Sequence, residues 1–186
     1  QLAAHAARHG LPLVFTSSAM VFHHQPDGPH HRHDPRTAED DYGRYKIACE
    51  DAVRAACPAA CSARLGWQID ADGRGNNMLA QLDQQHARDG RIGASRRWRP
   101  ACSFMPDSAR ALLGLIEERA GGIVHLDSNA GEGHTFEGIV RALAARFERT
   151  HWQVQAGDAY AHDQRLVGDE ARLAPLSLRL PSLRAR

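Results

Sequence analysis

Lysine is almost absent from this chain of 186 residues. Lys46 is the single one, and the other 22 of the 23 basic side chains are arginines. An ammonium is a compact point charge with three donors, whereas a guanidinium is a broad planar fork that keeps its proton near neutral pH. We therefore expect position 46 to require an amine.

Other absences exclude whole classes of protein. No stretch approaches the roughly 18 apolar residues of a membrane-spanning helix, and the first residues lack the basic-then-apolar order of a signal peptide. We therefore expect a cytoplasmic protein without a membrane partner. The net charge is +1 and the arginines are scattered, which argues against a nucleic-acid partner. The four cysteines form neither a CxxC pair nor a dense disulfide pattern, which is typical of free thiols in a reducing compartment.

Strand and helix patterns alternate along the chain. Short apolar runs predict buried parallel strands over 11–17, 61–67 and 122–127. Periodic segments predict helices over 2–9, 40–57, 77–89, 107–119 and 135–147. In the fourth helix, the apolar stripe expected to face the core is Ala109, Leu112, Leu113 and Ile116. Repeated alternation of this kind indicates an α/β fold.

Tyr42 precedes the lone lysine by four residues on the predicted helix 40–57. That spacing puts both side chains on one helix face, where the cation favours the phenolate and makes Tyr42 a stronger general acid. The strand before this helix ends in Ser17 and Ser18. Its carboxyl end is where open α/β folds bind ligands, and the hydroxyls there would meet a substrate carbonyl.

A serine at the end of such a strand, followed by Tyr-x-x-x-Lys on the next helix, resembles the extended short-chain dehydrogenase/reductase family. On this resemblance Ser18, Tyr42 and Lys46 match the catalytic triad, and Ser17 joins Tyr42 and Lys46 in contacting the cofactor. Later segments are similar to the landmarks of the dTDP-4-dehydrorhamnose reductase group. They are Arg64-Leu65-Gly66-Trp67, Gly75-Asn76-Asn77-Met78, Arg99-Pro100, Pro106-Asp107-Ser108-Ala109, and the late strand Gly122–Leu126 with the helix after it.

The resemblance implies a fold in two parts. Residues 1–70 would form the C-terminal portion of a Rossmann-like parallel sheet and carry the serine and the Tyr-x-x-x-Lys motif. Residues 71–186 would form a small α/β substrate-binding lobe, which on this resemblance includes the late strand Gly122–Leu126.

The resemblance also implies an activity, the reduction of a nucleotide-linked 4-keto-6-deoxy sugar by NADH or NADPH. Ser18 and Tyr42 would hydrogen-bond the carbonyl oxygen, Tyr42 would donate the proton, and Lys46 would hold the nicotinamide ribose. Contacts with the nucleotide sugar are expected from Trp67, Asn77 and Arg99, the last by bidentate pairing with phosphate. A homodimer is compatible with this assignment.

The sequence departs from the family in two places. A complete member begins with a strand, a Gly-rich turn and a helix that holds the cofactor pyrophosphate, and no such unit precedes Leu11. We therefore interpret the chain as a fragment of a full enzyme. Ala19-Met20 also stands where the family has Asp-Tyr. Two alternatives remain open, an NAD-dependent sugar-nucleotide epimerase and a sugar-nucleotide-binding remnant without catalysis.

Histidines are concentrated in one loop. Five of the 12 fall within eleven residues, enough for a zinc or nickel site, namely His23, His24, His30, His31 and His33. No cysteine or carboxylate stands at a diagnostic spacing, and three prolines in the segment indicate a loop. We expect no specific metal site, and we treat these side chains as candidates for substrate contacts.

Overall fold

The computed structural model describes residues 1–72 and 77–184. Its α-helices are α1 (Leu2–His9), α2 (Asp41–Ala56), α3 (Met78–Asp89), α4 (Met105–Glu117), α5 (Phe136–Arg146) and α6 (Leu176–Arg179). Its strands are β1 (Val14–Ser18), β2 (Cys61–Leu65), β3 (Trp67–Ile69), β4 (Ile92–Arg99), β5 (Cys102–Phe104), β6 (Gly122–Leu126) and β7 (Val154–Asp163). Short 3-10 turns are η1 (Ala19–Val21), η2 (Glu170–Arg172) and η3 (Pro181–Leu183).

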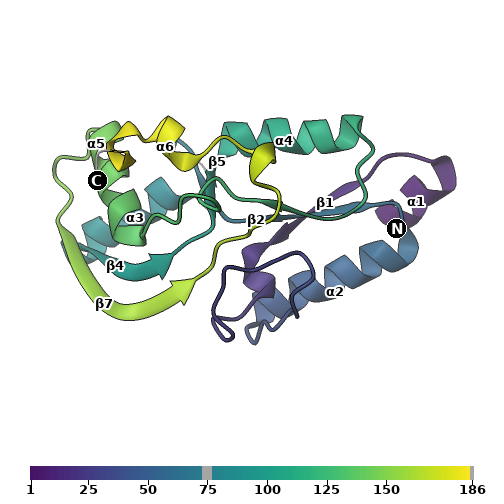
Figure 1. Cartoon of the computed structure of the whole chain (residues 1–186), viewed down its shortest axis with the longest axis horizontal. Coiled ribbons are helices and arrows are strands. Elements are labelled where there is room, and N and C mark those ends of the chain that lie inside the picture. The colour runs from purple at the N-terminus through teal and green to yellow at the C-terminus, as the bar shows by residue number, and fades with distance from the viewer. Residues whose placement is uncertain (73–76, 185–186) are drawn as a thin grey trace.

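A parallel sheet of three strands, in the order β1-β2-β6, forms one part of the molecule. Helices α2 and α4 lie on its opposite faces (Figure 1). The α4 face is apolar, because Cys61, Ala63, Val124 and Leu126 of the sheet pack with Leu115 of α4. Every strand ends at the same edge, since parallel neighbours place their carboxyl ends together.

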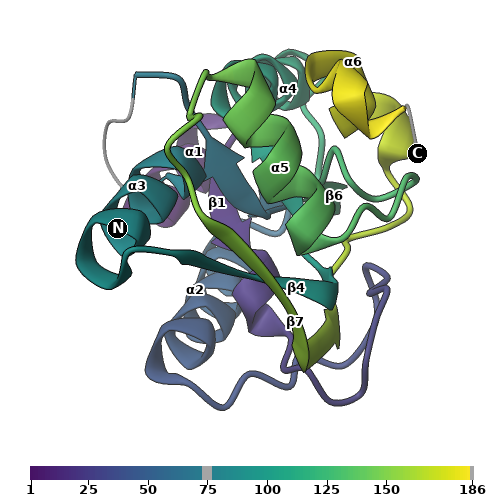
Figure 2. The same ribbon diagram turned by 90° about the vertical axis from the view of Figure 1, so that its left-hand side faces the viewer.

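The second part is a lobe made of two short parallel pairs, β3 with β5 and β4 with β7. Helix α5 packs against the β4–β7 pair (Figure 2). The core of the lobe is apolar and includes Ile69, Met78, Leu79, Leu82, Ile92, Ile139, Leu143 and Leu176. This core gives β4 and the aromatic side chains on it a fixed position beside the first sheet.

The α/β prediction is confirmed, and the predicted helices and strands appear within a few residues of their expected bounds. Helix α1 ends at Gly10, which takes the left-handed conformation with φ of 60°, as the sequence predicted. Strand β1 starts later than expected and ends at Ser18. The predicted strand 61–67 is interrupted at Gly66, because β2 pairs with β6 while β3 leaves to pair with β5.

The late strand is a correction. From the resemblance we expected Gly122–Leu126 in the substrate-binding part, but β6 pairs with β2 along its whole length, from Cys61 with Gly122 to Leu65 with Leu126. The chain therefore returns to the first sheet after building part of the lobe. The division into 1–70 and 71–186 stays a proposal about domains, with β6 and α4 belonging by contact to the first part.

The expected core stripe of α4 is wrong for three of its four members. Ala109, Leu113 and Ile116 are exposed, and only Leu112 packs against the core as expected. Leu115 is fully buried instead, and Ser108 lies on the same buried side. The helix is thus rotated by roughly a quarter to a third of a turn from the orientation that hydrophobicity alone favours, since each residue turns the helix by about 100°.

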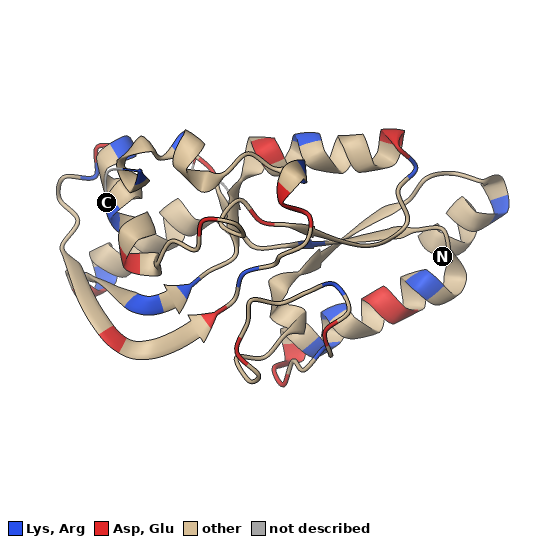
Figure 3. Ribbon diagram, viewed as in Figure 1, with Lys and Arg blue, Asp and Glu red and all other residues tan. Residues whose placement is uncertain are grey.

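Acidic and basic positions are scattered along the ribbon and separated by long stretches without charged residues (Figure 3). Among residues 1–72 and 77–184, no helix has the length and apolar content needed to cross a membrane. The landmark residues Gly75 and Asn76 lie outside the described residues.

Candidate active site

A pocket of about 540 Å³ opens at the carboxyl ends of β1 and β2. Five of the seven residues predicted to form a site line it, namely Ser17, Ser18, Tyr42, Lys46 and Trp67. The remaining lining comes from Thr16, Ala19, Met20, Leu65, Gly66, Gln68, Trp98 and Gln164. Strand ends, the first turns of α2 and one edge of the lobe thus meet around a single volume.

The lone lysine is held in place by the first strand. Lys46 Nζ donates a hydrogen bond to the backbone carbonyl oxygen of Thr16 at 3.1 Å. The same nitrogen lies 5.2 Å from the ring centroid of Phe15 and 5.6 Å from that of Tyr42. Because an ammonium has three donors, two remain for a ligand after the Thr16 contact. Both rings also attract the cation, which keeps it at the rim of the pocket.

Ser18 ends β1 and starts the 3-10 turn η1. Its hydroxyl oxygen accepts a hydrogen bond from the backbone N–H of Met20 at 3.1 Å, which caps the turn. An accepting hydroxyl keeps its own hydrogen for donation. Ser18 can therefore donate to an acceptor in the pocket without losing the bond that orients it. Ser17 is buried behind it, with 4% of its surface exposed.

Helix α2 approaches η1 closely at the start of the site. Asp40 caps the helix, and its carboxylate accepts from Gly43 N at 2.9 Å. A Cβ on Gly43 would lie 2.3 Å from the carbonyl oxygen of Met20, so only glycine lets the helix come this near. The close approach brings Tyr42, which is 52% exposed, to the same pocket as Ser18.

Aromatic side chains form the wall on the lobe side. Trp67 and Trp98 lie with ring centroids 6.4 Å apart and nearly parallel, and Phe136 lies 4.4 Å from Trp98 behind them. Both tryptophans line the pocket. Flat apolar surfaces of this kind pack well against the faces of sugar rings or bases. The position of Trp67 agrees with the substrate contact expected for it, and that role stays a prediction.

Two predicted contacts, Asn77 and Arg99, lie outside the pocket. Asn77 is fully buried, and its side chain caps α3 by accepting from Ala80 N at 3.0 Å. Arg99 is exposed at the end of β4, and its Nε donates to the carbonyl oxygen of Gly133 at 3.2 Å. The structure thus gives both side chains other partners in this state, and their contacts with a nucleotide stay predictions.

The histidine loop lies beside the lobe and lines no part of the pocket. His30 forms a bridge with Leu166 and stacks on Phe22 with ring centroids 4.3 Å apart. Burial lowers the pKa of His30 from its ordinary value, against the charges of Asp34 and Asp163. Within residues 1–72 and 77–184, no three or more His, Cys, Asp or Glu side chains are grouped to hold a metal ion.

Sequence reasoning missed four side chains of the pocket, namely Met20, Gln68, Trp98 and Gln164. Met20 was noted only as a departure from the family pattern. Its sulfur now accepts from Gln164 Nε2 at 3.5 Å, which joins η1 to the segment after β7. No local signal marks Gln164, because it reaches the site through pairing of β4 with β7. Trp98 could have been suspected as a large aromatic residue in an arginine-rich stretch.

Comparison with known proteins identifies a family whose model matches most of the chain. A family model described as the RmlD substrate binding domain matches residues 1–165. A curated dTDP-4-dehydrorhamnose reductase of Mycobacterium tuberculosis is 31% identical over 146 residues, which are 76% of this chain and 47% of that protein. The chain therefore spans about half the length of the curated relatives it matches.

Solved structures show the same fold. The dTDP-4-dehydrorhamnose reductase of Clostridium acetobutylicum superposes with a TM-score of 0.79 at 18% identity, over 99% of this chain and 69% of that one. The Bacillus anthracis enzyme of that name, solved in complex with NADP, gives 0.76 at 14% identity, over 99% and 68%. At such identities the likeness establishes the fold of the chain.

Proposed function

The chain belongs to the RmlD substrate-binding domain family, and on that premise we propose that its pocket reduces a ketone of a nucleotide-linked 4-keto-6-deoxy sugar with NADH or NADPH. The observation that carries the proposal is the meeting of Ser18, Tyr42, Lys46 and Trp67 in one pocket at the carboxyl ends of parallel strands. Local sequence puts only Tyr42 and Lys46 together, so the convergence of the other two is independent support.

The chemistry follows from the donors in the pocket. A ketone oxygen gains negative charge as its carbon is reduced, and two donors aimed at that oxygen stabilise the charge. Ser18 has a hydrogen to donate, since its oxygen is already used as an acceptor. Tyr42 would donate the second hydrogen bond and then pass its proton to the oxygen, which makes it the general acid.

A nicotinamide cofactor fits the residues that are present. The Lys46 ammonium spends one donor on Thr16 and is half-buried at the rim, so its other donors suit the vicinal hydroxyls of a ribose. Ser17, next to Ser18, is the further residue proposed to contact the cofactor. A bound reduced nicotinamide supplies hydride to the carbonyl carbon.

The substrate is proposed to enter from the lobe side. Trp67 would pack on the sugar ring, and Trp98 extends the same wall toward β7. Arg99 and Asn77 are kept as proposed contacts of the nucleotide, which for Arg99 requires exchange of its Gly133 partner. A homodimer is the proposed assembly.

Two other functions are kept as alternatives. One is a protein that binds the nucleotide sugar without turning it over, because the wall of Trp67 and Trp98 can pack on a sugar whether or not a cofactor is bound. An NAD-dependent epimerase is the third candidate, because it would use the same Ser18, Tyr42 and Lys46.

The test uses the full chain with purified NADPH, NADH and dTDP-4-dehydrorhamnose. Cofactor binding is followed by the fluorescence of the reduced nicotinamide, and turnover by loss of its absorbance and by identification of the sugar product. Binding and net oxidation of the nicotinamide support the reductase. Inversion of the sugar with no net oxidation indicates the epimerase. Binding of the sugar nucleotide without detectable affinity for either cofactor overturns the reductase and supports the binding protein.

A further inference from the structure

The face of the first sheet toward α2 differs from the face toward α4. Alternate residues of the central strand β2 point to α4 and are apolar, whereas Arg64 points to α2. Arg64 is 1% exposed and its partner Glu50, on α2, is 4% exposed. A charged pair thus occupies the place where a helix usually packs apolar side chains on a sheet.

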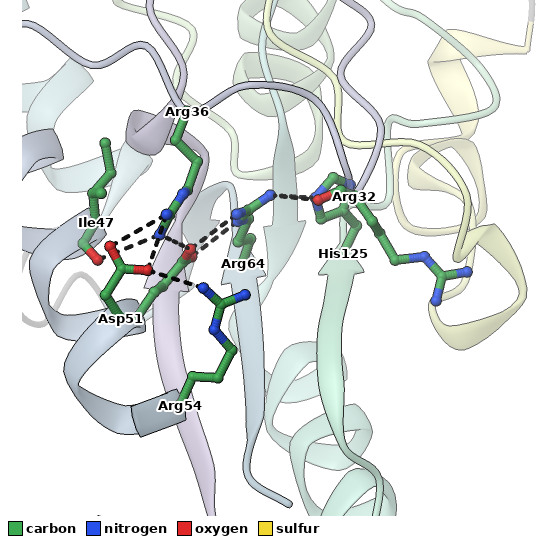
Figure 4. A network of polar contacts seen from close by, with 8 residues as sticks. Arg32, Arg36, Ile47, Asp51, Arg54, Arg64 and His125 are labelled. Carbon is green, nitrogen blue, oxygen red and sulfur yellow. Dashed lines mark hydrogen bonds and ion pairs between the residues drawn. The ribbon is translucent and has the colours of Figure 1, made fainter. Parts of the chain in front are cut away.

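Arg64 contacts three elements at once. Its Nε and Nη2 donate to the two carboxylate oxygens of Glu50, each at 2.9 Å. Its Nη1 donates to the carbonyl oxygen of Arg32 at 3.2 Å and to His125 Nε2 on β6 at 3.4 Å. Figure 4 shows Arg64 between α2 and His125, with Arg36 reaching the same part of α2. The guanidinium also lies over Phe22, 5.0 Å from its ring centroid.

The network fixes its own protonation states. A guanidinium can only donate, so His125 Nε2 must accept, and Nδ1 then donates to the carbonyl oxygen of Val167 at 3.2 Å. Burial, followed by the charge of Arg64, lowers the pKa of His125 to about 4. Burial alone would raise the pKa of Glu50, but the hydrogen bonds and charge of Arg64, together with Ser17 and the charge of Arg36, bring it below its ordinary value.

Helix α2 buries few of its own side chains. Between Asp41 and Ala56 the buried residues are Gly43 and Glu50, and Ile47 and Val53 are half-buried against small apolar clusters. An amphipathic helix is usually oriented by a continuous stripe of buried apolar side chains, and here a bidentate ion pair supplements a sparse one. Buried ion pairs add little stability compared with apolar residues of the same size, so their best-attested benefit is a fixed geometry.

The pair stands on the same helix face as the candidate catalytic residues. Tyr42, Lys46 and Glu50 are spaced four residues apart, so they follow one another along one face of α2. Lys46 is bonded to β1 through Thr16, and Glu50 is bonded to β2 through Arg64. Two polar anchors one turn apart therefore fix both the distance and the rotation of the helix against the sheet.

We propose that the buried Glu50–Arg64 pair is a positioning device for the pocket, which sets Tyr42 and Lys46 of α2 against Ser18 of β1. Neither residue lines the pocket, so both act through the helix. The assignment of Tyr42 and Lys46 as the reacting groups rests on the proposed function, whereas the mechanical claim about α2 does not. The test of that claim must therefore measure the position of α2 against the sheet by a method that does not depend on turnover.

Because the chain has a single lysine, a measurement on labelled lysine reports on Lys46 alone. Carbon-13 labelling of lysine gives one side-chain signal, that of Lys46, whose ε protons are shifted by the ring currents of Phe15 and Tyr42. In the double variant Glu50→Leu/Arg64→Met, apolar side chains of similar size replace the pair and keep the face filled. We expect a folded protein in which the Lys46 signal moves toward the position of free lysine. Arg64→Gln, which removes the guanidinium fork and adds no second lysine, should move the same signal.

A matched control comes from a second ion pair. Arg179 donates to Asp107, 7% exposed on α4, at 2.6 Å and 2.9 Å, and neither residue lines the pocket. Asp107→Leu/Arg179→Met should leave the Lys46 signal unchanged. A wild-type Lys46 signal in whichever of the two Arg64 variants folds overturns the proposal.

Turnover separates this proposal from the proposed function. If the wild-type chain is active, the folded Arg64 variants should lose about 10²-fold in kcat at unchanged KM, because a misplacement of about 1 Å costs that much. If the wild-type chain is inactive, the lysine signal still decides whether the pair positions α2. Equal losses of kcat in the Asp107→Leu/Arg179→Met control would assign the effect to general stability and overturn the positioning role.

Discussion

Lys46 donates a hydrogen bond from its ammonium to the carbonyl oxygen of Thr16, 3.1 Å away and thirty residues earlier in the chain. This contact ties the one lysine of the protein to the strand that delivers Ser18. The carbonyl is that of a strand residue two positions before Ser18, so the bond fixes lysine, tyrosine and serine to one another.

Replacing Tyr42 by phenylalanine should abolish turnover and leave the fold intact. The change removes the proposed proton donor, and general acids of this kind contribute about 10²–10⁴-fold to rate. The ring is 52% exposed, so little packing is lost. Tyr45→Phe is the matched control, because Tyr45 lies on the same helix, is 63% exposed and does not line the pocket. Equal rates for the two variants would remove Tyr42 from the mechanism.

Replacing Lys46 by arginine should show whether cofactor binding needs only a positive charge at this position or the shape of an ammonium as well. Arginine retains a donor for Thr16 and a positive charge, so the free energy of unfolding should change by less than about 0.5 kcal/mol. The planar fork cannot serve the carbonyl and a ribose in the way three ammonium donors can, so affinity for NADPH should fall about tenfold or more. Urea unfolding and nicotinamide fluorescence measure the two effects. Unchanged cofactor affinity would show that any cation suffices at position 46.

Gly66 is predicted to tolerate no side chain. A Cβ there would lie 2.3 Å from the backbone carbon and oxygen of Ala101, which accepts from Trp67 N at 2.8 Å. Relief would require breaking this bond, so Gly66→Ala should destabilise the protein by about 1–3 kcal/mol. Gly93→Ala is the control, since its Cβ would meet nothing nearer than 3.9 Å. Equal urea midpoints for the two variants would contradict the close approach.

His162 should make stability fall on acidification. Burial, with the charges of His30 and His24, lowers its pKa to about 4, against the opposing charges of Asp27 and Asp163. The folded pKa lies below the unfolded value of 6.5, so between these values the unfolded chain binds more protons. Stability is therefore lost as pH falls from about 6.5 toward 4.

The measurement compares the unfolding free energies of the wild type and of histidine variants as a function of pH. The unfolding free energy of wild type minus that of His162→Phe should fall by up to about 1.4 kcal/mol per pH unit in this window. His151→Phe, which changes an exposed histidine, is the matched control for the loss of an imidazole. A flat difference for His162→Phe would mean that His162 binds its proton equally well in the folded and the unfolded chain.

Much of the fold and part of the site could be predicted from local sequence. The Tyr42 and Lys46 pair depends on helical spacing alone, and helix α2 formed within a residue of the bounds 40–57 that the sequence predicted. The resemblance to reductases drawn from this motif and its neighbours is confirmed by the family match. Ser18 was predictable as well, because a strand that ends in a serine is a local pattern.

Other features could not be predicted because long-range pairing decides them. Strands β4 and β7 contain arginines, glycines and alternating small residues, and they become strands by pairing with each other across sixty positions of sequence. The orientation of α4 also escaped prediction, since Leu113 and Leu115 are equally apolar and only contact with the sheet buries the second. Which face of α4 is buried depends on the side chains of the sheet that lie opposite it.

The sequence by itself determined that one amine would stand four residues after a tyrosine, on a helix that follows a serine-ended strand. Those are consequences of spacing, which any isolated segment carries. The tertiary structure alone decided that Trp98 and Gln164 join the pocket, and that α2 is oriented by Glu50 on Arg64. These contacts join residues that are far apart in sequence, so no local pattern predicts them. For Glu50 and Arg64 the physical reason is burial, because a charge removed from water requires a partner of opposite sign.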